Sequence, residues 1–115
     1  MVSFGFVRSA LCAGALVSVF LPFNPVAAQV TGLALAQAKH CVSCHRVDKK
    51  LVGPPFNAIA QRFKGEEAAT PYLAQRIREG GRGQWGAIGM PRQDDVSQED
   101  AENLAAWILS LYGNK

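Results

Sequence analysis

The cysteine pair in the pentapeptide CVSCH, Cys41 and Cys44, is the feature that most restricts what this chain can fold into. The sequence has one other cysteine, Cys12, and none after residue 44. Two thiols three residues apart can bind a metal, form a redox-active disulfide or carry a covalently attached cofactor. Each of these chemistries needs different partners elsewhere in the chain, so the rest of the sequence must decide between them.

The segment 1–28 has the three-part pattern of a secretory signal peptide. A basic residue, Arg8, precedes an apolar run from Ala10 to Leu21, and the tripeptide VAA at 26–28 supplies small residues before a cleavage point. The apolar run is shorter than the ~20 residues that cross a bilayer, so a cleaved leader is favoured over a retained membrane anchor. We therefore predict an exported, periplasmic protein whose mature domain spans residues 29–115.

Loss of this leader changes both the cysteine count and the charge. It removes Cys12 and Arg8, and the remaining 87 residues carry 11 basic and 9 acidic side chains, a net charge of +2. This charge is too small to indicate nucleic-acid binding. A domain of this size hides only about 60–65% of its unfolded surface, so a large buried cofactor would help to complete its core. A disulfide between residues 41 and 44 closes too short a loop to do the same.

The mature chain favours an all-α fold of three to four short helices, because strand-like alternation is weak throughout. The expected helices are one that follows Gly32 and carries Cys41 in its last turn, one from Phe56 closed by Gly65, one that starts at Thr70-Pro71 and ends at Gly80, and one capped by Ser97 and Asp100 and stopped by Gly113. A long glycine-rich loop, GGRGQWGAIGMPRQDDV, separates the last two. Loops of this length in small domains are usually functional.

Two of the three chemistries open to CVSCH find little support in the rest of the chain. A structural zinc site needs four ligands, but no cysteine follows residue 44 and the only histidines, His40 and His45, lie beside the same pair. A thioredoxin-like dithiol belongs at a strand-to-helix junction, and it gives His45 no task. Free thiols or a disulfide in the mature protein would nevertheless restore the dithiol alternative.

The third chemistry, covalent attachment of a c-type haem, uses both cysteines and the histidine of the motif. Cysteines at i and i+3 lie on one helical face and can form two thioethers along one edge of a porphyrin. His45 then lies one turn after Cys41 and is placed to bind the iron. Met90, the only methionine after the leader, lies in a glycine- and proline-bounded loop rather than on an apolar stripe. Its polarizable thioether suits reduced iron, so Met90 is the favoured second axial ligand.

The mature chain resembles the short bacterial class I monohaem cytochromes c over residues 32–112. The resemblance rests on CVSCH, LVGPPF, YLAQRIREGGRGQWG, GMP and LAAWILSLY, which occur in that order. It implies the cytochrome c fold, one haem c per chain, and His/Met axial ligation by His45 and Met90. It also implies that the Pro54 carbonyl accepts the Nδ1–H of His45, and that Arg76 and Trp85 hydrogen-bond or shield a haem propionate. Gln93 matches a position near the methionine sulfur.

The chain departs from the family pattern at a few positions. His40 precedes the first cysteine, where the family often has a small residue. Ala87 and Gly89 replace prolines that are common beside the methionine ligand, so the loop that carries Met90 is expected to be more flexible.

The predicted function is outer-sphere electron transfer by a monomeric, non-enzymatic carrier that binds no nucleic acid. The resemblance implies a membrane cytochrome complex as donor and a nitrite reductase or terminal oxidase as acceptor. Four cations, Lys39, Lys49, Lys50 and Arg92, are candidates for steering acidic partners to an exposed haem edge, although scattered surface charge is a nearly equal reading. A haem subunit of a larger dehydrogenase or oxidase, and a haem-based sensor whose Met90 leaves the iron, remain as alternatives.

Overall fold

The computed structural model describes residues 30–113 and the single positions 1 and 5. Four α-helices and one 3₁₀ turn make up its secondary structure: α1 Gly32–Ala38, η1 Cys41–Ser43, α2 Phe56–Arg62, α3 Ala69–Glu79 and α4 Gln98–Ser110. Within residues 30–113 the only strand-like pairing is an isolated bridge between Gly81 and Met90. The all-α prediction is therefore confirmed. The predicted leader and its cleavage point lie outside the described range 30–113.

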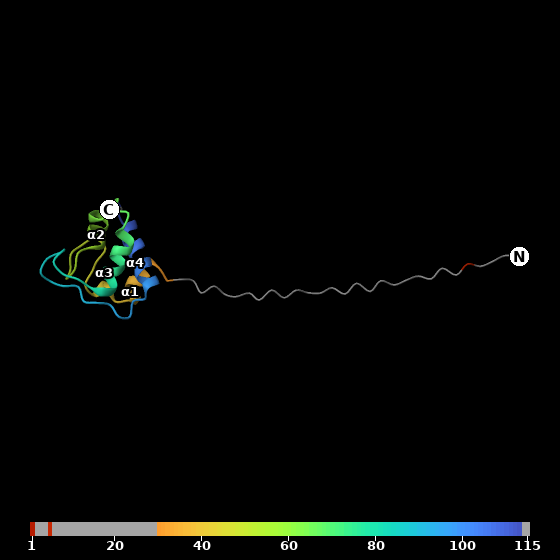
Figure 1. Ribbon diagram of the computed structural model, residues 1–115, viewed down its shortest axis with the longest axis horizontal. Helices are drawn as coiled ribbons and strands as arrows, with labels where there is room; N and C mark the ends of the chain where they lie inside the picture. Colours follow the sequence, from red (N-terminus) through yellow and green to blue (C-terminus); the bar gives the residue numbers. More distant parts are fainter. Residues whose placement is uncertain (2–4, 6–29, 114–115) are drawn as a thin grey trace.

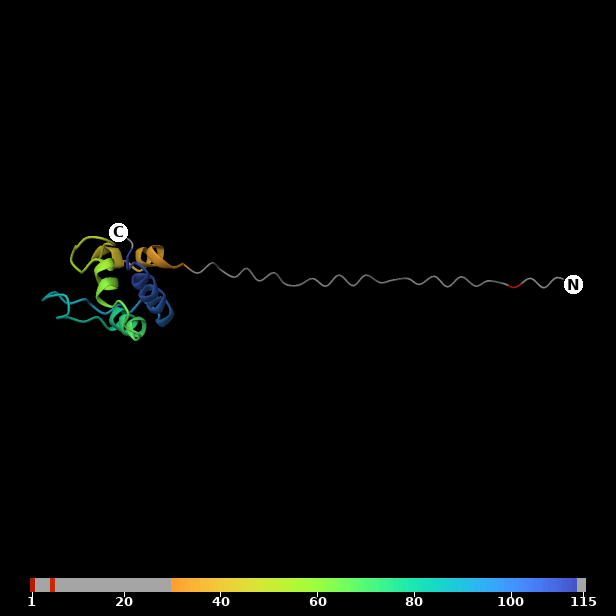
Figure 2. The same cartoon turned by 90° about the horizontal axis from the view of Figure 1, so that it is seen from above.

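Helix α4 is the centre of the fold, because it packs against each of the other three α-helices. Figure 2 shows this helix, in blue, between α1 and the green α2 and α3. Its predicted apolar stripe is buried at Ala101, Leu104, Ala105 and Ile108. Burying a leucine or isoleucine side chain contributes about 1.5–3 kcal/mol, so this stripe holds the helical body together.

The start of α4 follows the predicted capping pattern. The hydroxyl oxygen of Ser97 accepts a hydrogen bond from the backbone N–H of Asp100 at 3.0 Å, and acidic residues occupy the first turn. This satisfies one of the amide groups that a helix start leaves without a partner. Gly113, which was expected to stop the helix, adopts the left-handed conformation with φ 83° just beyond it.

The first helix is shorter than predicted, and Cys41 does not belong to it. Helix α1 ends at Ala38, and His40 then adopts a left-handed conformation with φ 58° and ψ 15°. Residues in this conformation do not continue a right-handed helix, so the chain restarts as the 3₁₀ turn η1. The prediction that a single helix delivers Cys41 in its last turn was therefore wrong.

The third helix also begins earlier than predicted. Helix α3 starts at Ala69, its N-cap is Ala68, and no side chain caps it. Thr70 and Pro71 lie inside the first turn, where the proline's missing N–H removes no helical hydrogen bond. The predicted end at Gly80 is confirmed, since this glycine follows the helix with φ 74°.

Two irregular segments complete the domain. Residues 46–55 connect the CVSCH turn to α2, and residues 81–90 form much of the long connection between α3 and α4. Both extend from the helical body on the side away from the start of α1 (Figure 1). In the described part of the chain, no helix is long and apolar enough to cross a membrane.

Candidate functional site

The CVSCH pentapeptide forms a single compact turn. The backbone N–H groups of Cys44 and His45 both donate to the carbonyl of Cys41, at 3.1 and 3.0 Å. The guanidinium of Arg46 donates to the carbonyl of Val42 and fastens the same turn. Cys41 is half-buried, Cys44 is exposed, and no disulfide joins the two thiols.

The environment of Cys41 does not favour redox chemistry by a dithiol. Burial is the main reason why the pKa of its thiol is raised; a backbone hydrogen bond opposes this effect in part, and the nearby carboxylate of Asp95 adds a smaller increase. Its Sγ lies 3.8 Å from the carbonyl oxygen of Lys39. Reactive dithiols instead lower the pKa of one cysteine, because the thiolate is the nucleophile.

His45 is buried and held in one orientation. Its Nδ1 lies 2.7 Å from the carbonyl oxygen of Pro54, the partner expected from the resemblance. A carbonyl can only accept, so Nδ1 carries the proton and Nε2 keeps a free lone pair. Such a hydrogen bond orients a ligating histidine and makes it a stronger donor. The ring of Phe56 stacks on the imidazole with centroids 5.2 Å apart.

A glycine makes this position of the imidazole possible. A Cβ atom added to Gly53 would lie 2.5 Å from Cε1 and 2.8 Å from Nδ1 of His45. Atoms that are not bonded do not approach so closely. The backbone of the GPP segment therefore lies directly against the ring, and only glycine fits there.

The imidazole faces a largely apolar cavity of about 190 Å³. The cavity is lined by parts of the CVSCH turn, the segment around Pro54, helices α2, α3 and α4, and the loop at 80–91. The seven residues predicted for the site all line it: Cys41, Cys44, His45, Pro54, Arg76, Trp85 and Met90. Gln93 does not line it, and its side-chain amide instead donates to the carbonyl of Pro91 at 2.9 Å.

Met90 reaches the cavity from the base of the glycine-rich loop. Its backbone exchanges two hydrogen bonds with Gly81, at 2.7 and 3.0 Å, and this pair closes the loop. Gly80 approaches the same segment so closely that an added Cβ would lie 2.4 Å from the Met90 carbonyl oxygen. The Gly80-Gly81 pair thus ends α3 and positions Met90.

Arg76 brings a polar atom into this apolar surface. Its Nε is buried and has no hydrogen-bond partner among the described residues, while its Nη2 lies 3.5 Å from a carboxylate oxygen of Glu79. A buried donor without an acceptor is costly, so the cavity is suited to a ligand that supplies one. Trp85 also lines the cavity but is 39% exposed, and the Arg62 guanidinium lies 4.8 Å from the centre of its ring.

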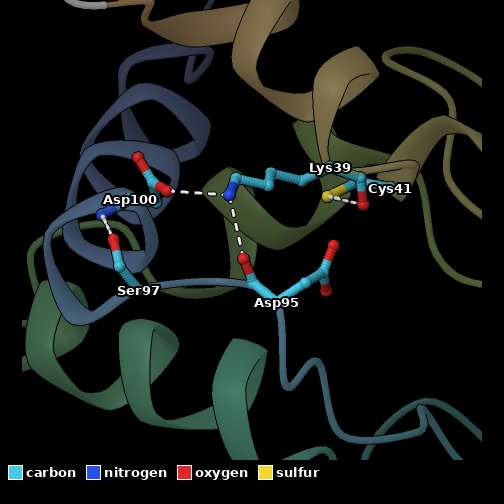
Figure 3. Close-up of polar contacts among 5 residues, drawn as sticks. All are labelled: Lys39, Cys41, Asp95, Ser97 and Asp100. Carbon is cyan, nitrogen blue, oxygen red and sulfur yellow. Dashed lines mark hydrogen bonds and ion pairs between the residues drawn. The ribbon is translucent and has the colours of Figure 1, made fainter.

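Two of the four predicted steering cations are already paired. Figure 3 shows the Lys39 ammonium between α1 and α4, where it lies 3.0 Å from an Asp100 carboxylate oxygen and donates to the Asp95 carbonyl at 2.9 Å. The hydrogen bond from Lys39 is the main reason why the pKa of Asp100 is lowered. Lys39 therefore stabilises the fold and is not a free charge for steering a partner protein.

Arg92 is paired as well, because its Nε lies 2.7 Å from a carboxylate oxygen of Asp94. Lys49 and Lys50 are exposed and form no ion pair within residues 30–113. Only Lys49 and Lys50 of the four predicted cations are thus left without an ion pair among residues 30–113.

The sequence interpretation missed three residues that build the site. Gly53 and Gly80 were taken only as loop and helix-end signals, although their close approaches fix the segments of His45 and Met90. The double prolines after Gly53 and the double glycine at 80–81 were the available signals. The contact of Arg62 with the loop had no signal, because the two are 22 residues apart in sequence.

A cavity lined by CVSCH, an oriented histidine and a loop methionine, within a small all-α domain, defines a class of haem-binding domain. The cytochrome c family model matches residues 29–112, and the chain belongs to this family. It is 40% identical over 101 residues to cytochrome c-551 of Pseudomonas aeruginosa. This match covers 77% of this chain and 96% of the relative. It is 44% identical over 77 residues to cytochrome c-552 of Nitrosomonas europaea, covering 67% and 75%.

Solved structures agree. The crystal structure of wild-type Nitrosomonas europaea cytochrome c552 superposes with a TM-score of 0.66 at 44% identity, covering 67% of this chain and 95% of that one. The chain is therefore a class I cytochrome c with one covalently bound haem c, and it is an electron-transfer protein rather than an enzyme. These conclusions confirm the predicted fold, cofactor and non-enzymatic nature.

The residues that line the cavity fit a haem. The apolar cavity suits a porphyrin, Nε2 of His45 has a free lone pair, and two thiols lie one turn apart at the cavity wall. The buried Nε of Arg76 matches the need for an acceptor such as a propionate.

Proposed function

We propose that this protein is a periplasmic carrier of single electrons whose haem c is attached through Cys41 and Cys44 and whose iron is bound by His45 and Met90. The observation that carries the proposal is the Nδ1–H hydrogen bond from His45 to Pro54. It leaves Nε2 free in a cavity that both thiols and Met90 also line. When bound, the haem supplies a one-electron couple between ferric and ferrous iron.

The protein residues determine how that couple is used. His45, strengthened by its bond to Pro54, is a strong donor, whereas the neutral thioether of Met90 favours the ferrous state. Ligation of the iron by both His45 and Met90 would leave no open coordination site for oxygen or peroxide. Pro54, Arg76 and Trp85 complete the proposed surroundings, the first through His45 and the other two at the propionates.

The surface around the cavity supports exchange of electrons with other proteins. Cys44 is exposed, and Val52 and Ile88, which also line the cavity, are 47% and 69% exposed. Exposed apolar side chains at a binding edge favour contact with a partner surface. A membrane cytochrome complex as donor and a nitrite reductase or terminal oxidase as acceptor are the proposed partners of a monomer that spans 29–115 after cleavage of its leader.

The proposal is tested on the protein purified from the periplasm. Its intact mass should equal residues 29–115 plus one haem, with no thiol available for alkylation, and it should be reduced reversibly by one electron. Cys44→Ala should strongly lower the yield of folded, haem-bearing protein. Alkylated cysteines, a Cys41–Cys44 disulfide, or a fully folded haem-free Cys44→Ala protein would contradict the proposal. Co-purification in a stable complex would indicate a subunit rather than a free carrier.

A further inference from the structure

The segment 82–89, which we call the ligand loop because it leads into Met90, has few contacts that hold it in place. Residues 82–88 are all exposed. Gly83 and Gly86 have positive φ values of 91° and 116°, and one backbone hydrogen bond of 3.2 Å between them is the loop's internal support. Few buried contacts and a solvent-exposed backbone are properties of segments that open easily.

One side chain ties the ligand loop to the helical body. Arg62, the last residue of α2, donates through Nη1 to the carbonyl oxygen of Gln84 at 2.7 Å. Its guanidinium also lies over the ring of Trp85, 4.8 Å from the centroid. This hydrogen bond joins the exposed tip of the loop directly to the end of a helix.

The same helix also contacts the His45 side of the cavity. Phe56, the first residue of α2, stacks on the His45 ring and is buried, as are Ile59 and Ala60 in the middle of the helix. Helix α2 is therefore a fixed element that touches the imidazole at one end and the ligand loop at the other. A contact from its last residue can restrain the loop relative to the histidine.

We propose that Arg62 is a positioning residue that acts as a latch on the ligand loop and keeps Met90 at the iron. This inference rests on the proposed ligation by Met90. A guanidinium is planar, so it can lie over an indole and donate in its own plane to a carbonyl at the same time. A lysine at this position keeps the charge but cannot make both contacts in that geometry.

The latch predicts a specific effect on an external ligand that competes with Met90. Imidazole can bind ferric iron only while the loop is open, so its apparent affinity scales with the open fraction. Loss of an exposed cation–π contact and one hydrogen bond should raise the open fraction about threefold to tenfold. Arg62→Ala should therefore bind imidazole about threefold to tenfold more tightly than the wild type, with Arg62→Lys between the two.

The experiment is an imidazole titration of the ferric holoprotein, followed by its visible absorption. The matched control is Lys64→Ala, because Lys64 makes a similar contact near the same helix end, over Tyr112 at 4.2 Å, without touching the ligand loop. This variant should bind imidazole like the wild type. Met90→Ala gives the affinity of a site without the methionine and sets the upper limit.

The outcomes separate the latch from the ligation on which it rests. Equal affinities for wild type and Arg62→Ala, both below that of Met90→Ala, would overturn the latch and leave Met90 as the ligand. An equal increase in Lys64→Ala would also overturn it, since the effect would then come from weakening the end of α2. Equal affinities for wild type and Met90→Ala would instead overturn the proposed ligation.

Discussion

The two sides of the haem cavity are built in opposite ways. His45 is buried, its Nδ1 is bonded to Pro54, and Phe56 and the backbone of Gly53 lie against its ring. Met90 is half-buried at the base of a loop whose exposed tip is tied to the helices by Arg62. The first side is prearranged by packing, whereas the second depends on a few contacts that can open. We infer that the histidine side determines whether the site forms, and the methionine side determines how it is tuned.

The largest expected effect is on the histidine side. Gly53→Ala would place a methyl carbon 2.5 Å from His45 Cε1, and the ring could move away only by losing its hydrogen bond to Pro54 or its stacking on Phe56. We expect the unfolding free energy of the holoprotein to fall by about 3 kcal/mol, with a lower yield of attached haem. Denaturant unfolding measures the change. Gly89→Ala, whose added carbon meets atoms only at 3.5 Å, is the control and should be nearly neutral.

A similar clash on the methionine side should have a more local effect. Gly80→Ala would place a methyl carbon 2.4 Å from the Met90 carbonyl oxygen, but residues 90–92, which it meets, lie outside any helix and can shift to relieve the clash. We expect a loss of stability of about 1–2 kcal/mol together with weaker methionine ligation in the ferric absorption spectrum. Gly83→Ala also has a positive φ but meets nothing within 4 Å, so it controls for backbone strain alone. Equal spectra for the two variants would contradict the assigned role of Gly80.

The turn before Cys41 offers a change in the stabilising direction. His40 adopts φ 58° without being glycine, a conformation that costs most residues about 1 kcal/mol. His40→Gly removes this strain but also increases the conformational entropy of the unfolded chain, which opposes the gain. We expect the unfolding free energy to rise by about 0.5–1 kcal/mol at most. His40→Ala keeps the strain and should give no gain. A destabilised glycine variant would indicate that the imidazole itself has a structural role.

The smallest effect concerns the ion pair that joins α1 to α4. Lys39 lowers the pKa of Asp100 in the folded state. The pair therefore stabilises the protein fully at any pH above the unfolded-state pKa of an aspartate, about 4. This contribution is lost as the pH falls through the lower pKa of the folded state. Asp100→Asn should therefore be less stable than the wild type at neutral pH, and the difference should vanish in acid. Glu67→Gln, at an exposed position without an ion pair in residues 30–113, should show no such pH-dependent difference.

The sequence predicted the parts of this molecule that depend on local patterns. The spacing of apolar residues predicts the buried stripe of α4, and the capping and helix-ending residues predict the Ser97 cap and the end of α3 at Gly80. The structure has all three. The break of α1 before Cys41 was missed because histidine seldom adopts a left-handed conformation, so nothing in the local pattern signals it.

Contacts between distant segments were harder to predict. The pairing of Lys39 with Asp100 joins residues 61 positions apart, and it turned an expected docking cation into a structural one. Composition gives the number of charges but not which of them are paired in the folded state. The same limit applies to Arg62 and the ligand loop. By contrast, the seven predicted site residues share one cavity, because each was tied to the same cofactor chemistry or to the family resemblance.

The central claim, that one prearranged histidine side and one loop-borne methionine side close on the same iron, is tested most directly by the absorption spectrum of the purified ferric protein. A weak far-red band that is present in the wild type, lost on reduction and absent in Met90→Ala is the expected result. Absence of this band from the wild type, or its persistence in Met90→Ala, would contradict the account.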